Sequence, residues 1–274
     1  MKYFKETCRY LFVKKGLKKW LYFLLFSIVP AALIAYGLPI YRLFFIVKTT
    51  EPLSFGQIWI TYFWRKGIIL TLVLAFFANV FFSSCISSSL TYHMRIGQFG
   101  LPRFFTSVNN NFFPCVSRTI TVAALLAVCY TVFILFDVLW NIVLNSVAAT
   151  IASAFMFALM VLLFTYLLST ATLWLPTMVL TGQKYRTALA GSYYQSRDLH
   201  KKYFVFDLLI VVFLMGFGVI AYFTAASPLI SWAITTVSYV ITFIFIHVFW
   251  FVAFFDFNQL TRADLTVSSF KRRL

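Results

Sequence analysis

One histidine, His247, lies well inside the last of the long apolar stretches of the sequence. Charged and hydrogen-bonding groups are costly inside a membrane, so a group retained there is a candidate for function. Thr236, Phe243 and Trp250 share one helical face with His247, because they lie at helical spacings from it. An imidazole in this place could carry a proton or bind a ligand. It could equally be neutral and hydrogen-bonded to a neighbouring helix.

A polar stripe in the second apolar stretch is the other candidate. Asn79, Ser83 and Ser87 follow one another at four-residue spacing, which places them on one face of a helix. The stripe could line a cavity, although Ser and Asn also join helices through hydrogen bonds. The candidate substrate-binding residues are therefore His247, Asn79, Ser83, Ser87 and Trp250.

Catalytic motifs are missing from the sequence. The acidic residues form no HExxH or DxxD spacing, and GxSxG, Walker and CxxC motifs do not occur. We therefore predict no enzyme, no catalytic residue, no metal site and no cofactor. An intramembrane enzyme would need Asp137, Asp207 and His247 to converge in the fold. For Asp207 and Asp256, which lie close to basic loops, structural ion pairs are the plainer expectation.

The elements that must position these residues are membrane spans. Hydrophobic residues make up 62% of the 274-residue chain and charged residues only 11%, against roughly 25% charged in soluble proteins. A helix needs about 20 apolar residues to cross a bilayer. We predict an all-α integral membrane protein with about six transmembrane helices. The predicted spans are 20–41, with Pro30 and Pro39 inside it, 67–90, 119–140, 149–175, 204–226 and 230–254.

The distribution of basic residues predicts the orientation. The connections at 141–146 and 224–228 contain no Lys or Arg, so they should face outward in a cell (plasma) membrane. The chain then divides into a basic cytoplasmic N-terminus (1–19), a six-helix domain (20–256) and a basic cytoplasmic tail (257–274). The first external loop, 42–66, is an exception because it is basic, and its aromatic residues predict an interfacial helix.

Partners follow from the net charge of +16. Because the basic residues flank apolar runs, they indicate contact with the lipid bilayer and its anionic headgroups rather than with nucleic acid. A membrane or cytoplasmic protein partner is also compatible with a basic cytoplasmic face.

A motif after the fourth span resembles a known family. Its residues are Pro176, Leu180, Gly182, Ala188, Leu189, Ser192 and Tyr193, followed by basic residues. It is similar to the membrane domain attached to some bacterial glycerophosphodiester phosphodiesterases. The resemblance implies a proline-terminated span followed by a short amphipathic cytoplasmic helix, and we expect short interfacial helices in the cytoplasmic loops. It implies no activity, because in those fusions the catalysis belongs to a separate soluble domain.

Two cytoplasmic loops also echo each other. Gly97, Gln98 and Ser107 recur 85 residues later as Gly182, Gln183 and Ser192. Either this is chance, or the chain contains two parallel units of span, loop and span, as many transporters do.

Two functions therefore compete. The first is a non-enzymatic membrane protein that binds or translocates a lipid-like or small substrate through the helix bundle. The second is a membrane scaffold or accessory subunit that docks a partner protein or complex through its basic cytoplasmic face.

Overall fold

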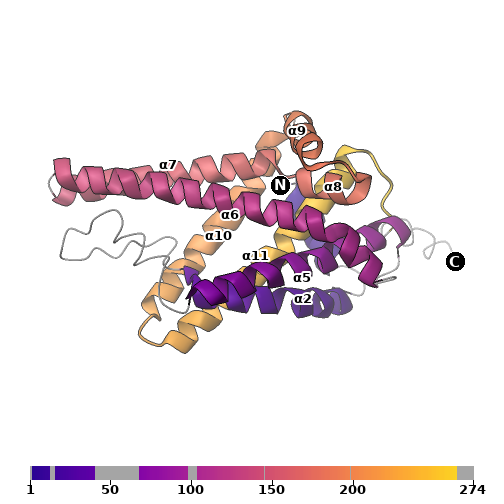
Figure 1. Ribbon diagram of the computed structural model, residues 1–274, viewed down its shortest axis with the longest axis horizontal. Helices are drawn as coiled ribbons and strands as arrows, with labels where there is room; N and C mark the ends of the chain where they lie inside the picture. Colours follow the sequence, from indigo (N-terminus) through magenta and orange to yellow (C-terminus); the bar gives the residue numbers. More distant parts are fainter. Residues whose placement is uncertain are drawn as a thin grey trace.

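The computed structural model describes residues 2–12, 16–40, 68–97, 104–144, 146–197 and 199–263. Within these residues the regular elements are all helices (Figure 1). They are α1 (Lys2–Phe12), α2 (Gly16–Gly37), α5 (Ile68–Ile96), α6 (Phe104–Val143), α7 (Ser146–Thr170), α8 (Trp174–Thr181), α9 (Tyr185–Ser196), α10 (His200–Phe223) and α11 (Pro228–Phe257). The interfacial helix predicted within 42–66 lies outside the described residues.

Six helical segments of the described chain are long and apolar enough to cross a membrane, which confirms the predicted all-α architecture. The first predicted span contains two prolines, and proline can kink or end a helix. In the structure α2 continues through Pro30 and ends at Gly37, before Pro39. At about 1.5 Å per residue, its 22 residues reach roughly 33 Å, which is enough to cross a hydrocarbon core of about 30 Å.

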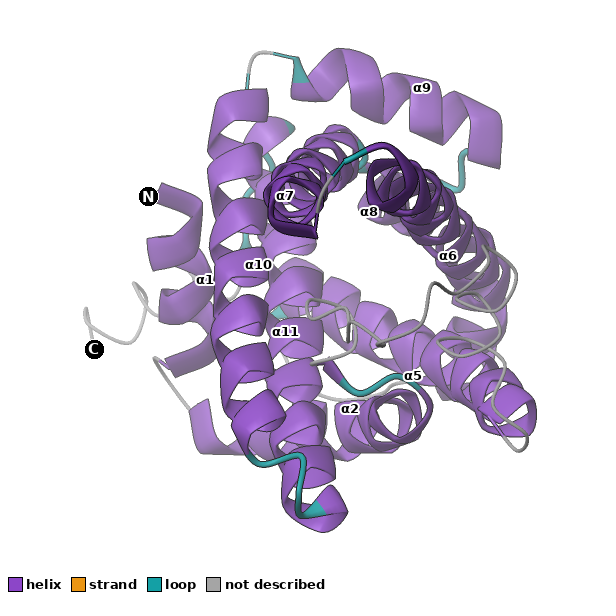
Figure 2. Ribbon diagram, turned by 90° about the vertical axis from the view of Figure 1, so that its left-hand side faces the viewer, coloured by secondary structure: helices purple, strands orange, loops and turns teal. Residues whose placement is uncertain are grey.

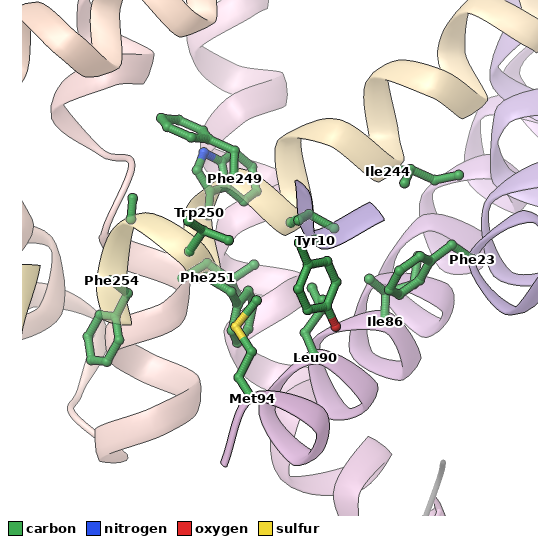
Figure 3. Close-up of a cluster of buried hydrophobic side chains, with 14 of the residues drawn as sticks. Tyr10, Phe23, Ile86, Leu90, Met94, Ile244, Phe249, Trp250, Phe251 and Phe254 are labelled. Atoms are coloured by element: carbon green, nitrogen blue, oxygen red, sulfur yellow. The ribbon is translucent and has the colours of Figure 1, made fainter. Parts of the chain in front are cut away.

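The six spans form a closed ring. Each contacts the next in the order α2, α5, α6, α7, α10 and α11, and α11 closes the ring on α2 (Figure 2). The last span, α11, is the most buried of them and also contacts α1, α5 and α8. Its apolar side chains meet those of α1, α2 and α5 in the main core cluster (Figure 3).

The α6–α7 hairpin is the least buried part of the ring and carries many exposed apolar side chains, among them Ile142, Val147 and Ile151. These side chains suit lipid, which provides an apolar solvent on the outside of the bundle.

The third predicted span was too short at its N-terminal end. Residues 119–140 are only part of α6, which has 40 residues and begins at Phe104. The helix continues through Pro114, even though proline removes one backbone hydrogen bond. As a result Cys115 and Arg118 lie inside a long helix.

The fourth predicted span, 149–175, lies within a candidate span at Val147–Thr181 that consists of two helices. The helix α7 ends at Thr170, and a turn at 171–173 leads into the separate helix α8. The hydroxyls of Ser169, Thr170 and Thr172 donate to carbonyl oxygens three residues earlier, which offers the backbone an alternative to a regular helix. Pro176 therefore lies in the first turn of α8, where its missing N–H costs nothing, and does not terminate a span.

The N-terminal segment is an integral part of the bundle. Within the predicted basic cytoplasmic N-terminus, 1–19, residues 2–12 form α1, whose buried face includes Tyr3, Tyr10 and Leu11. This face packs against α11, α10 and α2. Lys2 forms an ion pair with Asp256 at 2.8 Å, as expected for an aspartate beside basic segments.

Tyr3 strengthens the contact between α1 and α11. Its hydroxyl donates to the Asp256 carboxylate at 2.8 Å. Burial is the main cause that raises the pKa of Tyr3 above its ordinary value, with Tyr203 and Asp256 adding to it. The phenol therefore stays protonated at neutral pH and keeps its proton available for this hydrogen bond.

The two echoing loops begin in the same way. Gly97 and Gly182 both have a positive φ, 78° and 70°, which favours glycine. Each donates its backbone N–H to a carbonyl oxygen four residues earlier, in His93 and Met178, and so ends the preceding helix. Gln98 lies outside the described residues, and the duplication itself stays a hypothesis.

Candidate functional site

His247 lies in α11 with only 1% of its surface exposed. Its Nδ1 atom is 2.8 Å from the carbonyl oxygen of Phe243, one helical turn earlier. Because a carbonyl oxygen can only accept, Nδ1 carries the proton, and in a neutral imidazole Nε2 is then an acceptor. Among the described residues Nε2 has no hydrogen-bond partner. The imidazole thus offers one unused acceptor in the interior of the bundle.

Trp250 lies beside His247 on the predicted helical face. The two ring centroids are 5.4 Å apart. Trp250 is 2% exposed, and its indole N–H also lacks a partner among the described residues. The guanidinium carbon of Arg118, from α6, lies 3.8 Å from the centre of the indole ring. Sequence analysis had not assigned Arg118 to the site, and this contact brings α6 to the pair on α11.

Arg118 also connects the pair to the serine stripe of α5. Its charge acts on both His247 and Cys115. The Cys115 thiol, one turn before Arg118, lies beside the hydroxyls of Ser84 and Ser87. The Ser87 hydroxyl is fully buried and has no hydrogen-bond partner of standard geometry among the described residues. The site is therefore the junction of α5, α6 and α11, defined by His247, Trp250, Arg118, Cys115 and Ser87.

Asn79 and Ser83 take different places from the rest of the predicted site. The Asn79 amide donates to the Thr119 hydroxyl at 3.1 Å and so links α5 to α6. Ser83 is fully buried with an unpartnered hydroxyl, like Ser87. Among the three residues of the stripe, Ser87 is the one that lies beside a described residue of the junction, namely Cys115.

Two interhelical hydrogen bonds set the depth of Arg118. Asn79 binds Thr119, and Asn111 donates to Ser88 at 2.7 Å, which defines an antiparallel register between α5 and α6. Asn79 lies roughly 17 Å from the first residue of α5 and roughly 25 Å from the last, at about 1.5 Å per residue. Arg118 precedes Thr119, so its backbone lies level with the middle part of a span.

A charge at this depth is not stabilised by the observed contact alone. An arginine in the centre of a transmembrane helix costs about 2.5–3.5 kcal/mol to insert. A desolvated cation–π contact contributes about 2 kcal/mol. Arg118 forms no hydrogen bond or ion pair with another described residue, so its N–H donors are available. Arg118 is partly exposed.

The residues of the resembling motif build a corner outside this junction. Gly182 ends α8, and Ala188 and Ser192 form the buried face of α9. The Ser192 hydroxyl donates to the carbonyl oxygen of Thr170 and so caps the end of α7, while Leu189 packs against the core cluster. On the other face of α9 Lys184, Arg186, Tyr193 and Tyr194 are exposed. The helix is thus short and buries small side chains, and its place at the membrane interface stays a prediction.

Metal chemistry finds no support in the described residues, where no group of three His, Cys, Asp or Glu side chains could hold an ion. One acid, Asp137, lies apart from the junction. Asp137 accepts a hydrogen bond from Ser153 of α7 and lies roughly 28 Å from Arg118 along α6, at about 1.5 Å per residue. Asp137 therefore does not converge with His247, as an intramembrane enzyme would need.

The ring of apolar helices defines a multi-pass membrane protein. Comparisons with protein-family models, with curated proteins and with solved structures find no match. The resemblance to a phosphodiesterase membrane domain therefore stays a prediction.

The hydrogen bond of Asn79 leads to a first prediction. Asn79→Ala should lower the free energy of unfolding by only about 0.6 kcal/mol, the average for a polar contact between membrane helices. Ligand binding should be unchanged, because the amide already has its partner on α6. Thermal unfolding in detergent and the translocation assay described below measure the two effects. A loss of translocation as large as that of a Trp250 variant would contradict this assignment.

Proposed function

We propose that this protein is a non-enzymatic membrane protein that binds a lipid-like or small substrate at the junction of α5, α6 and α11 and translocates it. The observation that carries the proposal is the set of polar atoms without partners at that junction. His247 Nε2, the Trp250 indole N–H and the Ser87 hydroxyl are buried without partners among the described residues, and the partly exposed Arg118 lies against the Trp250 ring. Buried polar groups are normally paired, and a ligand would pair them.

The proposal places the protein in the plasma membrane with both termini in the cytoplasm. Support comes from the basic residues Lys184, Arg186 and Arg197, which lie exposed on or beside α9. Reporter fusions at the two termini and in the connection at 224–228 test this orientation. Reporters should be cytoplasmic at both termini and external at the connection.

A translocation assay tests the function. The full chain is reconstituted into vesicles that contain a fluorescent phospholipid, and dithionite is added outside to reduce the accessible label. Wild-type protein should expose the label of both leaflets, so that nearly all fluorescence is lost. His247→Ala and Trp250→Phe should slow this loss at least about tenfold, because each removes one hydrogen-bonding atom from the junction.

Trp232→Phe is the matched control for this assay. Trp232 lies near the other end of α11, and its indole N–H already donates to the carbonyl oxygen of Ala32 at 3.1 Å. This variant should translocate like the wild type. Both site variants should remain in the membrane fraction at wild-type amounts. Unchanged rates in both site variants would contradict the proposal.

The second candidate, a scaffold that docks a partner protein, has one observation in its favour. The outer face of α9 combines exposed Arg186 with exposed Tyr193 and Tyr194, and aromatic and arginine side chains are common at protein interfaces. Substitution of these three residues by serine should then abolish partner capture without changing lipid translocation.

A further inference from the structure

The charge of the junction is unbalanced. The carboxylates among the described residues belong to Glu6, Asp137, Asp207 and Asp256. None of them forms an ion pair or a hydrogen bond with Arg118. The contact that Arg118 does make, with the face of the Trp250 ring, uses its positive charge but supplies no acceptor for its N–H groups.

The groups around Arg118 are mostly donors. The guanidinium has five N–H donors in a planar fork, and the indole of Trp250 adds one more. The Arg118 side chain lies across the indole, so both sets of donors belong to one small region. The Cys115 thiol, one turn before Arg118, and the Ser87 hydroxyl beside that thiol are neutral groups that leave the positive charge in place. A phosphate or carboxylate group matches this arrangement in charge and in hydrogen-bonding geometry.

We propose that the substrate of this site is anionic and that its phosphate or carboxylate group binds Arg118, with the Trp250 N–H as a second donor. This inference rests on the proposed function and names the chemical class of its substrate. The anionic group belongs either to a lipid headgroup or to a free small anion. Because Arg118 contacts Trp250, which is buried in α11, the group is bound within the helix bundle.

Ligand-induced stabilisation of the purified full chain tests the proposal. Protein in a neutral detergent is titrated with short-chain phosphatidylglycerol, with short-chain phosphatidylcholine and with inorganic phosphate, and the thermal midpoint is recorded. Phosphatidylglycerol should bind about tenfold or more tightly than phosphatidylcholine, because only its headgroup carries a net negative charge. Stabilisation by phosphate alone identifies a free anion as the source, and stabilisation by phosphatidylglycerol without phosphate identifies a headgroup.

Variants separate the site from the surface charge of the protein. Arg118→Gln should abolish the preference for phosphatidylglycerol, whereas Arg118→Lys should keep part of it, because lysine keeps the charge and loses the planar fork. Arg186→Gln, which removes a charge from the exposed face of α9, should keep the full preference. The comparison of the two phospholipids is made on the wild-type protein. It therefore still tests the proposal if Arg118→Gln does not fold.

Two results would overturn the inference. One is equal binding of the two phospholipids by the wild type, or no binding of any of the three probes. The other is a loss of preference in Arg186→Gln that equals the loss in Arg118→Gln. If the phospholipids bind equally and Trp250→Phe still slows translocation, the proposed function holds and only its anionic substrate class fails.

Discussion

Phe249→Ala should destabilise the protein by about 3–5 kcal/mol, the range for removing a large buried aromatic side chain. Phe249 is fully buried in α11, and its ring stacks on Phe206 of α10 with a centroid distance of 3.8 Å. It also meets Tyr203 at 5.8 Å and Tyr3 of α1 at 6.0 Å, both edge to face. One ring thus joins three helices, and its loss leaves a cavity where they meet.

Thermal or urea unfolding in detergent, followed by circular dichroism, measures this effect. Phe155→Ala is the matched control, because Phe155 on α7 is 65% exposed and faces the surroundings of the bundle. It should change the unfolding midpoint little. Limited proteolysis should in addition show earlier cleavage near α1 in Phe249→Ala, since Tyr3 loses one of its aromatic contacts. Similar midpoints for the two variants would show that Phe249 does not organise the core.

Asp207→Leu should stabilise the protein by about 1–3 kcal/mol, because it removes an unsatisfied buried polar group. Asp207 is 1% exposed in α10, and neither carboxylate oxygen has a hydrogen-bond partner among the described residues. Sequence analysis expected an ion pair here, as it did for Asp256. Asp256 has such a pair with Lys2, but Asp207 does not.

Unfolding midpoints of Asp207→Asn and Asp207→Leu measure this gain. Leucine should stabilise at least as much as asparagine, because it leaves no polar group unpaired in the interior. Asp256→Asn is a control in which the opposite effect is expected. It breaks the ion pair with Lys2 and should destabilise the protein. Natural proteins retain such a costly group mainly where function requires it. A lower midpoint in both Asp207 variants would mean that the carboxylate has a stabilising partner.

Much of the membrane architecture could be predicted from the sequence. Six apolar stretches predicted six spans, because the length needed to cross a bilayer and the cost of unpaired backbone groups there are local constraints. The resemblance after the fourth span likewise predicted a short helix, which the structure has as α9. The ends of spans were less predictable. At Thr170 hydroxyl groups compete with the helix, and at Phe104 a helix starts well outside the apolar stretch.

The candidate site was predictable only in part. His247 and Trp250 share a face because of their spacing along one helix, and the structure keeps them adjacent. Asn79 had the same kind of signal, yet its amide is used in a link to Thr119. Nothing in the sequence indicated that Arg118 belongs to the site, because it directly precedes an apolar stretch, as many arginines in loops do. It could have been assigned to the site only if the third span had been predicted to begin before Pro114.

The sequence by itself determined that this chain is a membrane protein, how many times it crosses the bilayer and which residues share a helical face. These properties depend on neighbouring residues within one segment. Only the tertiary structure decided that α1 joins the bundle, that Asp207 has no partner among the described residues and that Arg118 lies against Trp250. These features depend on the register and rotation of helices that are far apart in the chain, and that arrangement comes from packing many side chains at once.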